Sequence, residues 1–335
     1  MKVLIISPLG FSITSLTRYA GIEKLAWQFS VELSKNHKVS VLGHADSIFP
    51  QGITNYPTEP IGDIFLSSEL RQYQRYHHIL RDFDVIHDFS HQHFASRFNY
   101  GMKSVNPFWH APSTGLYPKS PYNIIGLSQW AVREFKRYYH QNAIYQNCII
   151  VDTNVYKPLS TRTDRLLTLG KMSAEKGNLN AILLCKKLGV PLDVAGAKSD
   201  DKYEAEVKAQ CDSQQIVFHG EVSDEKKMQL LQTCRALIYF MPQGYEEVTS
   251  HKVQEALLCG AGVIATRAGA LPEIITQGVD GWLCSTDKEF EQAVKDIDKL
   301  QPEKTREATA KKYSIENVVA EHIELYQKVA EGLRW

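Results

Sequence analysis

The sequence predicts an α/β protein of two domains, each with a parallel β-sheet covered by helices. The chain has 335 residues, which is more than one hydrophobic core usually serves, so two domains of roughly 150 residues are expected. Short apolar, β-branched runs alternate with longer amphipathic stretches along the chain, as in parallel sheets with helices on both faces. The alternation occurs twice, and polar residues with Pro interrupt it near residues 152–163.

The short apolar runs are expected to form the strands of the two sheets. In the first half they are Val3–Ser7, Val39–Gly43, Val85–Phe89, Ser104–Trp109, Asn123–Ser128 and Cys148–Asp152. In the second half they are Leu166–Gly170, Leu192–Gly196, Ile216–Gly220, Ala236–Phe240 and Gly262–Thr266.

The amphipathic stretches between these runs are expected to be helical. Residues 314–335 form the last of them, with Ser314 as a plausible N-cap. Its apolar face comprises Ile315, Val318, Val319, Ile323, Tyr326 and Val329. The other helices are expected at Glu23–Leu33, Gln129–Tyr139, Asn180–Leu188, Glu225–Thr233 and His251–Cys259.

The composition excludes several classes of protein. The formal net charge is zero, which argues against a dedicated nucleic-acid binder. The six cysteines are scattered without a C-x-x-C pair, so no disulfide framework is expected and a reducing cytoplasm fits. No stretch approaches the ~18–20 apolar residues that span a bilayer, and the run Val3–Ile6 is too short for a signal peptide.

The segment Gly244–Gly260 (GYEEVTSHKVQEALLCG) carries two spaced carboxylates. Glu247 lies in the turn before the predicted helix, and Glu255 follows eight residues later inside it. Such a pair can bind two hydroxyl-bearing parts of one ligand, while the helix N-terminus between them favours a diphosphate. The alternative is an acidic turn and a solvated helix face, and the spacing by itself leaves both open.

These residues resemble the family 4 retaining glycosyltransferases, also described as glycosyl transferases group 1. Glu247 and Glu255, with Ala256 following, match the E-x7-E motif of that family. Residues 216–222 (IVFHGEV) resemble the strand and loop that read the nucleotide base through backbone groups. Residues 262–284 resemble its V-I-A-T-x-x-G-G-x-P-E-I-I-x-x-G-x-x-G-x-L run almost throughout.

The resemblance implies a role for individual positions of the donor site. Glu255 would bind the ribose hydroxyls, Glu247 the donor sugar, and the backbone at 249–251 the sugar or phosphate. The family usually has Phe-Gly where this chain has Thr249 and Ser250. The residues implied to bind the donor are Gly21, Gly170, Lys171, Lys176, Gly220, Val222, Glu247, Thr249, Ser250, His251 and Glu255.

Two lysines in the segment LGKMSAEKG would neutralise the leaving diphosphate without a metal ion. Lys171 and Lys176 follow the strand that ends in Gly170. Fixed cations near a developing phosphate charge lower the barrier to its departure. The family normally has Arg in place of Lys171, so the charge is kept but the bidentate fork is lost. Two surface lysines in an ordinary loop are the alternative.

Fewer residues of the first half match the family. Gly21, which opens a helix, resembles the second glycine of G-G-x-E, where the backbone approaches the donor phosphates, and Ala20 stands at the first. His110 follows a predicted strand and matches a His that faces the donor sugar. The resemblance therefore implies four catalytic residues, which are Glu247, His110, Lys176 and Lys171. The loop 11–19 is expected to face the acceptor.

The expected architecture is that of the GT-B fold, with two Rossmann-like domains facing each other across a cleft. Residues 1–152 would bind the acceptor, and residues 153–313 would bind the nucleotide-sugar. The helix 314–335 would cross back to the first domain. Hinge closure around the substrates would then be possible.

The expected activity is a metal-independent, retaining transfer of a hexose from a UDP- or GDP-linked sugar to an acceptor hydroxyl, with no cofactor. The acceptor would be a glycan, a lipid-linked molecule or a small molecule. Two alternatives are a GT-B nucleotide-sugar 2-epimerase and a non-catalytic subunit that binds a sugar nucleotide. The epimerase would not couple release of a nucleoside diphosphate to consumption of an acceptor.

Two further interpretations concern the first half. His87, His91 and His93 have a spacing that could ligate zinc, although no nearby Cys or HExxH pattern supports a metal site. Residues 71–81 and 132–140 are basic and aromatic, so either could lie on an anionic membrane surface. A solvated helix face explains these two stretches equally well. The protein is thus expected in the cytoplasm, with peripheral contact to the inner membrane face as an option.

Overall fold

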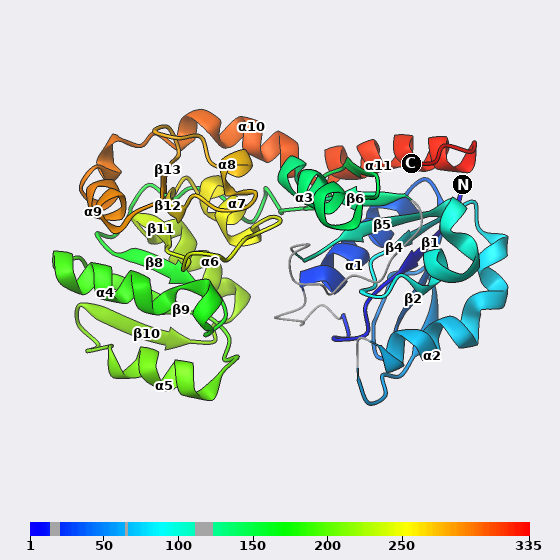
Figure 1. The fold of residues 1–335 in the computed structure, drawn as a ribbon, viewed down its shortest axis with the longest axis horizontal. Helices are drawn as coiled ribbons and strands as arrows, with labels where there is room; N and C mark the ends of the chain where they lie inside the picture. The colour runs from blue at the N-terminus through cyan, green and yellow to red at the C-terminus, as the bar shows by residue number, and fades with distance from the viewer. Residues whose placement is uncertain (14–20, 64–65, 111–122) are drawn as a thin grey trace. The chain divides into compact units, whose positions relative to one another are not determined.

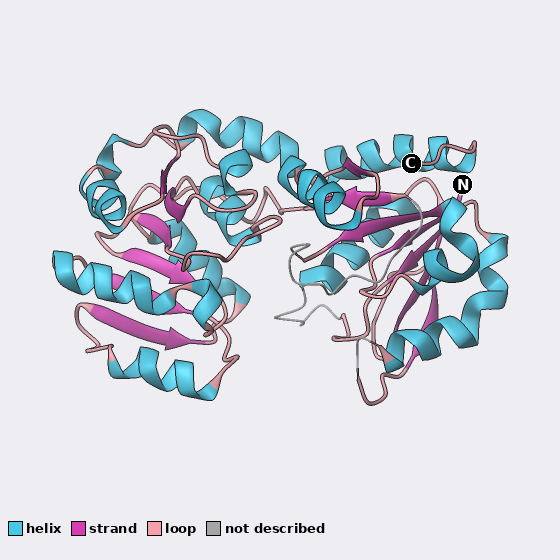
Figure 2. Cartoon of the chain, in the orientation of Figure 1, coloured by secondary structure: helices cyan, strands magenta, loops and turns pink. Residues whose placement is uncertain are grey.

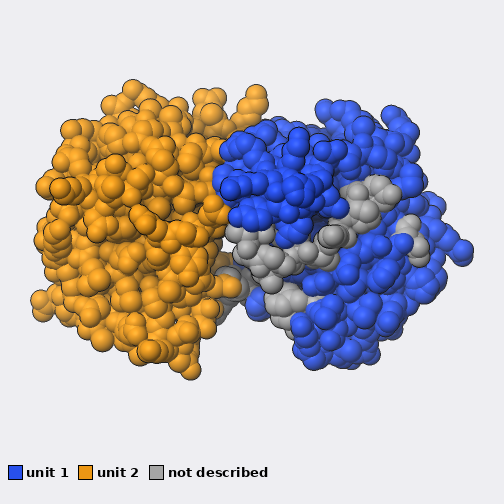
Figure 3. Space-filling view, viewed as in Figure 1, with its two compact units in different colours: residues 1–150, 314–335 blue, residues 151–313 orange. Residues whose placement is uncertain are grey.

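A computed structural model describes residues 1–13, 21–63, 66–110 and 123–335. Of Asn99 it describes only the backbone. The chain divides into two compact units (Figure 1, Figure 3). The first comprises Met1–Ile150 and Ser314–Trp335, and the second comprises Val151–Tyr313. The division lies two residues before the expected boundary. The expected loop 11–19 falls mostly outside the described residues, as does Ala20.

The first unit contains a seven-stranded sheet in the order β3-β2-β1-β4-β5-β6-β7. All of its neighbouring strands are parallel. Strand order reverses between β1 and β4, so their connections leave the sheet in opposite directions. The strands are β1 (Lys2–Ile6), β2 (Lys38–His44), β3 (Thr54–Thr58), β4 (Val85–Asp88), β5 (Ser104–Phe108), β6 (Ile124–Gly126) and β7 (Ala143–Tyr145).

Helices cover the strands of the first unit (Figure 2). The last helix, α11, packs against α1 and β4, although it follows the second unit in sequence. Ser314 is its N-cap, and the Ser314 hydroxyl accepts the Asn317 backbone N–H, as the sequence predicted. The helices are α1 (Gly21–Ser34), α2 (Ser67–Tyr76), α3 (Gln129–Tyr139) and α11 (Ile315–Ala330), with shorter helical turns η1 (His77–Asp82), η2 (Ser96–Tyr100) and η3 (Gly101–Lys103).

The second unit contains a six-stranded parallel sheet in the order β10-β9-β8-β11-β12-β13. Its strand order reverses between β8 and β11. The strands are β8 (Leu166–Leu169), β9 (Leu192–Ala195), β10 (Ile216–Gly220), β11 (Ala236–Tyr239), β12 (Gly262–Thr266) and β13 (Gly281–Cys284). The helices are α4 (Asn178–Leu188), α5 (Asp201–Ala209), α6 (Asp224–Thr233), α7 (His251–Leu258), α8 (Leu271–Ile274), α9 (Asp287–Lys295) and α10 (Glu303–Tyr313), with turns η5 (Ala174–Lys176) and η6 (Ile297–Lys299).

Both faces of the second sheet are buried. Successive side chains of a strand point to opposite faces, so neighbouring residues of one strand belong to two different cores. Leu237 and Tyr239 of β11 pack with Val253 and Leu257 of α7 on one face. Ile238, between them in sequence, packs on the other face with residues of α4 and α9. A strand buried on both faces needs apolar residues at nearly every position, which explains the continuous apolar runs of the sequence.

The prediction of two α/β domains with parallel sheets is confirmed, but individual strands differ. The expected strand Cys148–Asp152 is wrong, because that segment is largely buried but forms no strand. Three strands were missed, namely β3, β7 and β13. β3 and β7 are short edge strands with only partial burial, so their sequences lack the continuous apolar pattern.

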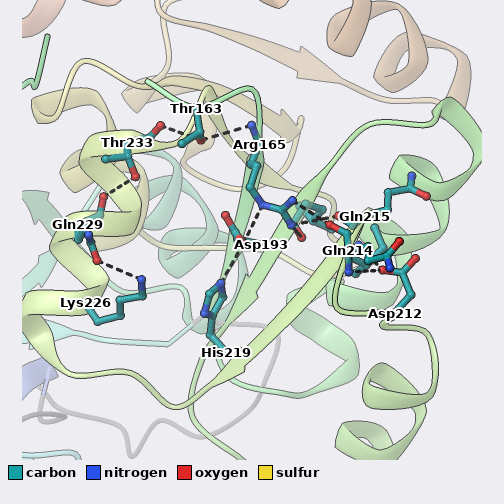
Figure 4. A network of polar contacts seen from close by, with 12 residues as sticks. Thr163, Arg165, Asp193, Asp212, Gln214, Gln215, His219, Lys226, Gln229 and Thr233 are labelled. Atoms are coloured by element: carbon teal, nitrogen blue, oxygen red, sulfur yellow. Dashed lines mark hydrogen bonds and ion pairs between the residues drawn. The ribbon is translucent and has the colours of Figure 1, made fainter. Parts of the chain in front are cut away.

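Arg165, just before β8, joins three strands of the second sheet (Figure 4). Its guanidinium donates to the carbonyl oxygens of Leu192 and Gln215, which lie on or beside β9 and β10. Its Nε lies 3.0 Å from the Asp193 carboxylate, which also contacts His219 Nε2 at 2.9 Å. A planar fork suits such divergent acceptors. Arg165 therefore stabilises the register of β8, β9 and β10.

A buried hydrogen bond joins α11 to the first sheet. His87 Nδ1 of β4 lies 2.6 Å from the Tyr326 hydroxyl of α11, and both side chains are fully buried. His322 of the same helix contacts the Val318 carbonyl through Nδ1 and the Cys148 thiol through Nε2. α11 is therefore held by specific polar contacts as well as by its apolar face.

Replacing Tyr326 by Phe is expected to destabilise the first unit. The substitution keeps the ring but leaves His87 Nδ1 without its hydroxyl partner in the core, at a cost of about 1–3 kcal/mol. Urea unfolding followed by tryptophan fluorescence measures the change. Tyr138→Phe is the matched control, because Tyr138 is an exposed residue of α3. Equal midpoints for the two variants would contradict a structural role for the hydrogen bond.

Among the described residues, no helix combines the length and apolar character needed to cross a membrane. The two basic aromatic stretches lie on helices that pack against the first sheet. In residues 71–81, Gln72 and Leu80 are buried while both ends, Arg71 and Arg81, are exposed. α3 likewise buries Phe135, while its basic side chains are exposed. The exposed basic faces fit both contact with an anionic membrane surface and a solvated helix face.

Candidate active site

The candidate site lies at the point where the strand order of the second sheet reverses. β8 and β11 are neighbours there, and the loops after them leave in opposite directions. In open parallel sheets, ligands bind in the crevice beyond the carboxyl ends of such strands. The loop after β8 contains Lys171 and Lys176, and the loop after β11 contains Glu247. The topology therefore brings these sequence-predicted residues to one edge.

Glu247 is held by two side chains from this edge. Lys176 Nζ lies 2.5 Å from Glu247 Oε1, and the Tyr239 hydroxyl donates to the same oxygen. Tyr239 is the last residue of β11 and is buried. Burial is the main reason that its pKa lies well above the ordinary value, and the Glu247 charge adds to the shift. The tyrosine therefore stays protonated, donates a hydrogen bond to Glu247 and orients its carboxylate.

The backbone of Glu247 is positioned by a glycine of the next loop. A Cβ at Gly269 would lie 2.2 Å from the Glu247 carbonyl oxygen, and Gly269 has φ +52°. The Ala270 N–H donates to that oxygen at 2.7 Å. Only glycine permits both the approach and the left-handed conformation. The RAGALPE segment therefore supports the turn that carries Glu247.

The loop after β8 needs a second close approach. Gly177, which follows Lys176, has φ +67° and would place a Cβ 1.9 Å from the Phe240 carbonyl oxygen. The loop that carries Lys176 therefore packs directly on the chain leaving β11. This contact sets the reach of the Lys176 side chain to Glu247. The glycine in the K-G pair of the sequence thus has a structural reason.

Glu255 belongs to a second charged group, on the inner side of α7. Lys227 Nζ of α6 lies 2.9 Å from Glu255 Oε1 and 5.5 Å from the centre of the Tyr156 ring. Burial lowers the pKa of Lys227, but the nearby Glu255 carboxylate outweighs burial and holds it above the ordinary value. Burial also lowers the pKa of His251, at the start of the same helix. Lys227 therefore carries its positive charge beside the Glu255 carboxylate.

The start of α7 differs in detail from the sequence prediction. Ser250 occupies the N-cap position, but its side chain makes no capping hydrogen bond. The Thr249 hydroxyl accepts from the Gln254 side chain at 3.2 Å. The helix has eight residues, from His251 to Leu258. Its N-terminus follows Glu247 in the same loop, as expected for a site that binds an anion there.

The other predicted donor residues lie at the same edge with fewer contacts. Gly170 follows β8, and its N–H donates to the Ala195 carbonyl. Lys171 is exposed in the same loop. Gly220 ends β10 with φ +65°, where the register with β9 shifts. Val222 packs against the apolar cluster that includes α7.

In the first unit, His110 lies beside a histidine that the sequence analysis had considered only for metal binding. The His110 and His91 rings are stacked with centres 5.5 Å apart. His91 Nδ1 lies 3.3 Å from the buried Glu69 carboxylate, which also accepts the His91 backbone N–H. Gly21 begins α1, and a Cβ there would meet no described atom within 4 Å. His91 and Glu69 thus join His110 as polar groups beyond β4 and β5.

The three histidines of the zinc alternative have separate surroundings. His91 pairs with Glu69, and His93 lies 3.8 Å from Asp88. In the described part of the chain, the one group with metal-ligand spacing is His87, Cys148 and His322, whose ligand atoms lie within 4.8 Å of one another. Burial raises the pKa of the Cys148 thiol and lowers those of both histidines. These groups are therefore neutral and form part of the core described above.

Four residues of the second-unit site were missed in the sequence. Tyr239 looked like an ordinary apolar strand residue, and Lys227 like one of several charges on α6. Tyr156 lies in the segment that was interpreted as a linker. Lys252 has a detectable signal, because a cation in the first turn of a helix opposes the helix dipole. Its Nζ lies 3.2 Å from the centre of the Tyr239 ring.

Residues 156–316 match the family model described as Glycosyl transferases group 1. The match covers nearly all of the second unit and includes both glutamates of the candidate site. No curated protein resembles the chain significantly in sequence. The second unit therefore matches this family model over nearly its whole length.

Solved glycosyltransferase structures resemble the whole chain. AviGT4, a glycosyltransferase involved in avilamycin A biosynthesis, is 21% identical at a TM-score of 0.75, over 100% of this chain and 99% of its own. HepE from Anabaena, in complex with UDP and glucose, is 16% identical at a TM-score of 0.70, and the match covers 98% of this chain and 99% of HepE. Sucrose-phosphate synthase from Thermosynechococcus elongatus is 13% identical at a TM-score of 0.77, and the match covers 99% of this chain and 100% of the synthase. These likenesses show the fold, and the predicted GT-B class is confirmed.

Proposed function

We propose that this chain, a GT-B protein whose second unit matches the glycosyl transferases group 1 model, transfers a sugar from a nucleotide-sugar to an acceptor hydroxyl. We further propose that the transfer proceeds with retention and without a metal ion. The observation that carries the proposal is the Lys176–Glu247–Tyr239 contact at the strand-order reversal of the second sheet, with Glu255 farther along the same segment. It places cations and carboxylates where this topology binds ligands.

Each group of the site has a role in this reaction. The bond between the anomeric carbon and the diphosphate oxygen breaks, and a bond from the same carbon to the acceptor oxygen forms. Lys176 and Lys171 would offset the charge that develops on the departing diphosphate, and the N-terminus of α7 would add to this effect. The acceptor proton would pass to the departing phosphate. His110 is assigned to the sugar by the family resemblance alone.

Glu247 is suited to bind hydroxyl groups of the sugar. The residue is partly exposed, with 17% of its side chain accessible, so its second oxygen can meet a ligand. The Tyr239 hydroxyl keeps one oxygen in place while Lys176 turns toward a phosphate. Glu255 would bind the ribose, and the ion pair with Lys227 holds its side chain in place. Two carboxylates held in this way would orient the nucleotide and the sugar separately.

A nucleoside diphosphate is proposed as the leaving group, with a uridine base favoured. HepE, which shares the fold, is described in complexes with UDP, with UDP and glucose, and with UDP-glucose. The loop after β10 would meet the base through its backbone, so few side chains distinguish one base from another.

The proposal is tested by nucleotide binding in the presence of EDTA. The panel comprises UDP, GDP, ADP, TDP and their glucose conjugates. We expect the nucleotides of one base to raise the melting temperature of the protein. Glu255→Gln should weaken the binding of that nucleotide by about tenfold and so reduce the rise in melting temperature, since it removes a charged hydrogen bond to the ribose. Glu206→Gln, on the exposed side of α5, is the matched control. No shift with any nucleotide, or equal shifts in both variants, would refute the donor site.

A further inference from the structure

Lys252 lies between the two glutamates of the E-x7-E motif, and the sequence analysis gave it no role. It occupies the first turn of α7. Its ammonium nitrogen lies 3.2 Å from the centre of the Tyr239 ring, at the end of β11. A Cβ on Gly170, at the end of β8, would be 3.1 Å from the same nitrogen. The Lys252 side chain therefore spans the two neighbouring strands where their order reverses.

The neighbouring lysines are paired with carboxylates, and Lys252 is not. Lys176 contacts Glu247, and Lys227 contacts Glu255. Among the described residues, no carboxylate lies within 4.0 Å of Lys252 Nζ. A cation in the first turn of a helix is also opposed by the helix dipole. The aromatic ring of Tyr239 offsets part of this cost.

These features together indicate an anion that is bound at Lys252 during function. We propose that Lys252 is a third cationic ligand of the donor diphosphate, an inference that rests on the function proposed above. Gly170, which has no side chain, leaves room beside the ammonium group for phosphate oxygens. The N-terminus of α7 lies beside Lys252, and its free backbone N–H groups also favour an anion.

The charged and titratable groups that face Lys252 are Lys176 from η5, Glu247 from the loop after β11, and Tyr239 from β11. Burial is the main reason that the pKa of Lys252 lies well below its ordinary value, and the Lys176 charge lowers it further, while Glu247 opposes the shift. A diphosphate beside the amine would favour its charged form. Donor binding should therefore be accompanied by uptake of a proton at Lys252.

Calorimetric titration with UDP and with GDP in EDTA tests the proposal on the full chain. Lys252→Met should weaken the binding of the diphosphate by about tenfold or more, while uridine and guanosine, which have no phosphate, should bind as they do to the wild type. Lys252→Arg should keep affinity within a few-fold, because the charge remains. Lys186→Met, exposed on α4, is the matched control and should bind like the wild type.

Repeating the titrations in buffers with different ionisation enthalpies measures the proton uptake. The wild type should take up protons on binding, and both Lys252 variants should take up fewer. The melting temperature of unliganded Lys252→Met should not fall, because the substitution removes a half-buried cation that has no carboxylate partner among the described residues. A fall would show that Lys252 has a structural role instead.

The possible outcomes separate the two proposals. If the wild type binds neither UDP nor GDP, both the donor site and the role of Lys252 fail. If the wild type binds a diphosphate and Lys252→Met binds it equally well, the role of Lys252 alone is wrong. If Lys252→Met loses affinity for the nucleoside as strongly as for the diphosphate, Lys252 does not recognise the phosphates.

Discussion

Lys176→Met is expected to lower the rate of donor cleavage by about 10²–10³-fold, the effect of removing one fixed stabiliser of a developing charge. In the free protein, the Lys176 ammonium lies 2.5 Å from Glu247. With the donor bound, the same ammonium group is proposed to meet the departing diphosphate. Since the acceptor is unidentified, cleavage is measured as release of nucleoside diphosphate from UDP-glucose and from GDP-sugars in water.

The controls distinguish loss of charge stabilisation from loss of structure. Lys176→Arg should retain more activity than Lys176→Met, and Lys186→Met should behave like the wild type. Glu247 keeps the Tyr239 hydroxyl as a partner in the Lys176→Met variant, so unfolding free energy should fall by no more than ~1 kcal/mol. A variant that cleaves the donor at the wild-type rate would exclude Lys176 from the departure step.

Acidification is expected to destabilise the first unit progressively below about pH 6.5, where unperturbed histidine gains its charge. Burial lowers the pKa of His322 to about 4 and that of His93 to about 3, and lowers that of His87 well below its ordinary value. The unfolded chain therefore binds protons at these residues from about pH 6.5 downward, whereas the folded unit does not. Stability then falls as the pH falls, since the unfolded state binds more protons.

Asp88 acts in the opposite direction and is counted against this effect. Burial raises the pKa of its carboxyl to about 7, so the folded unit holds a proton there that the unfolded chain releases above its ordinary pKa. Near pH 5, three histidine protons favour unfolding and one Asp88 proton favours folding. The net difference of about two protons from these four groups corresponds to a loss of roughly 2–3 kcal/mol of stability per pH unit, and Glu23, whose pKa burial also raises, reduces this loss.

Tryptophan fluorescence is a suitable measurement, because four of the five tryptophans, all except Trp282, lie in the first unit. Hydrogen exchange of peptides from each unit at pH 7 and pH 5 would locate the change. His93→Asn should flatten the pH dependence by about one proton, and asparagine tolerates the left-handed conformation that His93 adopts at φ +48°. A first unit that is equally protected at both pH values would contradict this account.

The candidate site could be predicted only in part. Glu247 and Lys176 lie in loops that follow strands, and parallel strands end at a common edge, so the sequence predicts that they lie together. Glu255 lies inside α7, and only the family resemblance singled it out. Lys252 and Tyr239 were not identified, since their contact joins the first turn of a helix to the end of a strand. The predicted strand at Cys148–Asp152 failed because apolar residues report burial, and burial does not require strand pairing.

The sequence by itself determined most of the buried strands and several of the helices, and that they form two parallel sheets. Local periodicity and capping decide these features, as at Ser314, whose hydroxyl caps α11. Only the tertiary structure decided which charges meet, such as Lys227 with Glu255 and Lys176 with Glu247. The physical reason is that these pairs lie 28 and 71 residues apart. Their distances are therefore set by the strand order and by how α6 and α7 pack, which no local pattern of residues specifies.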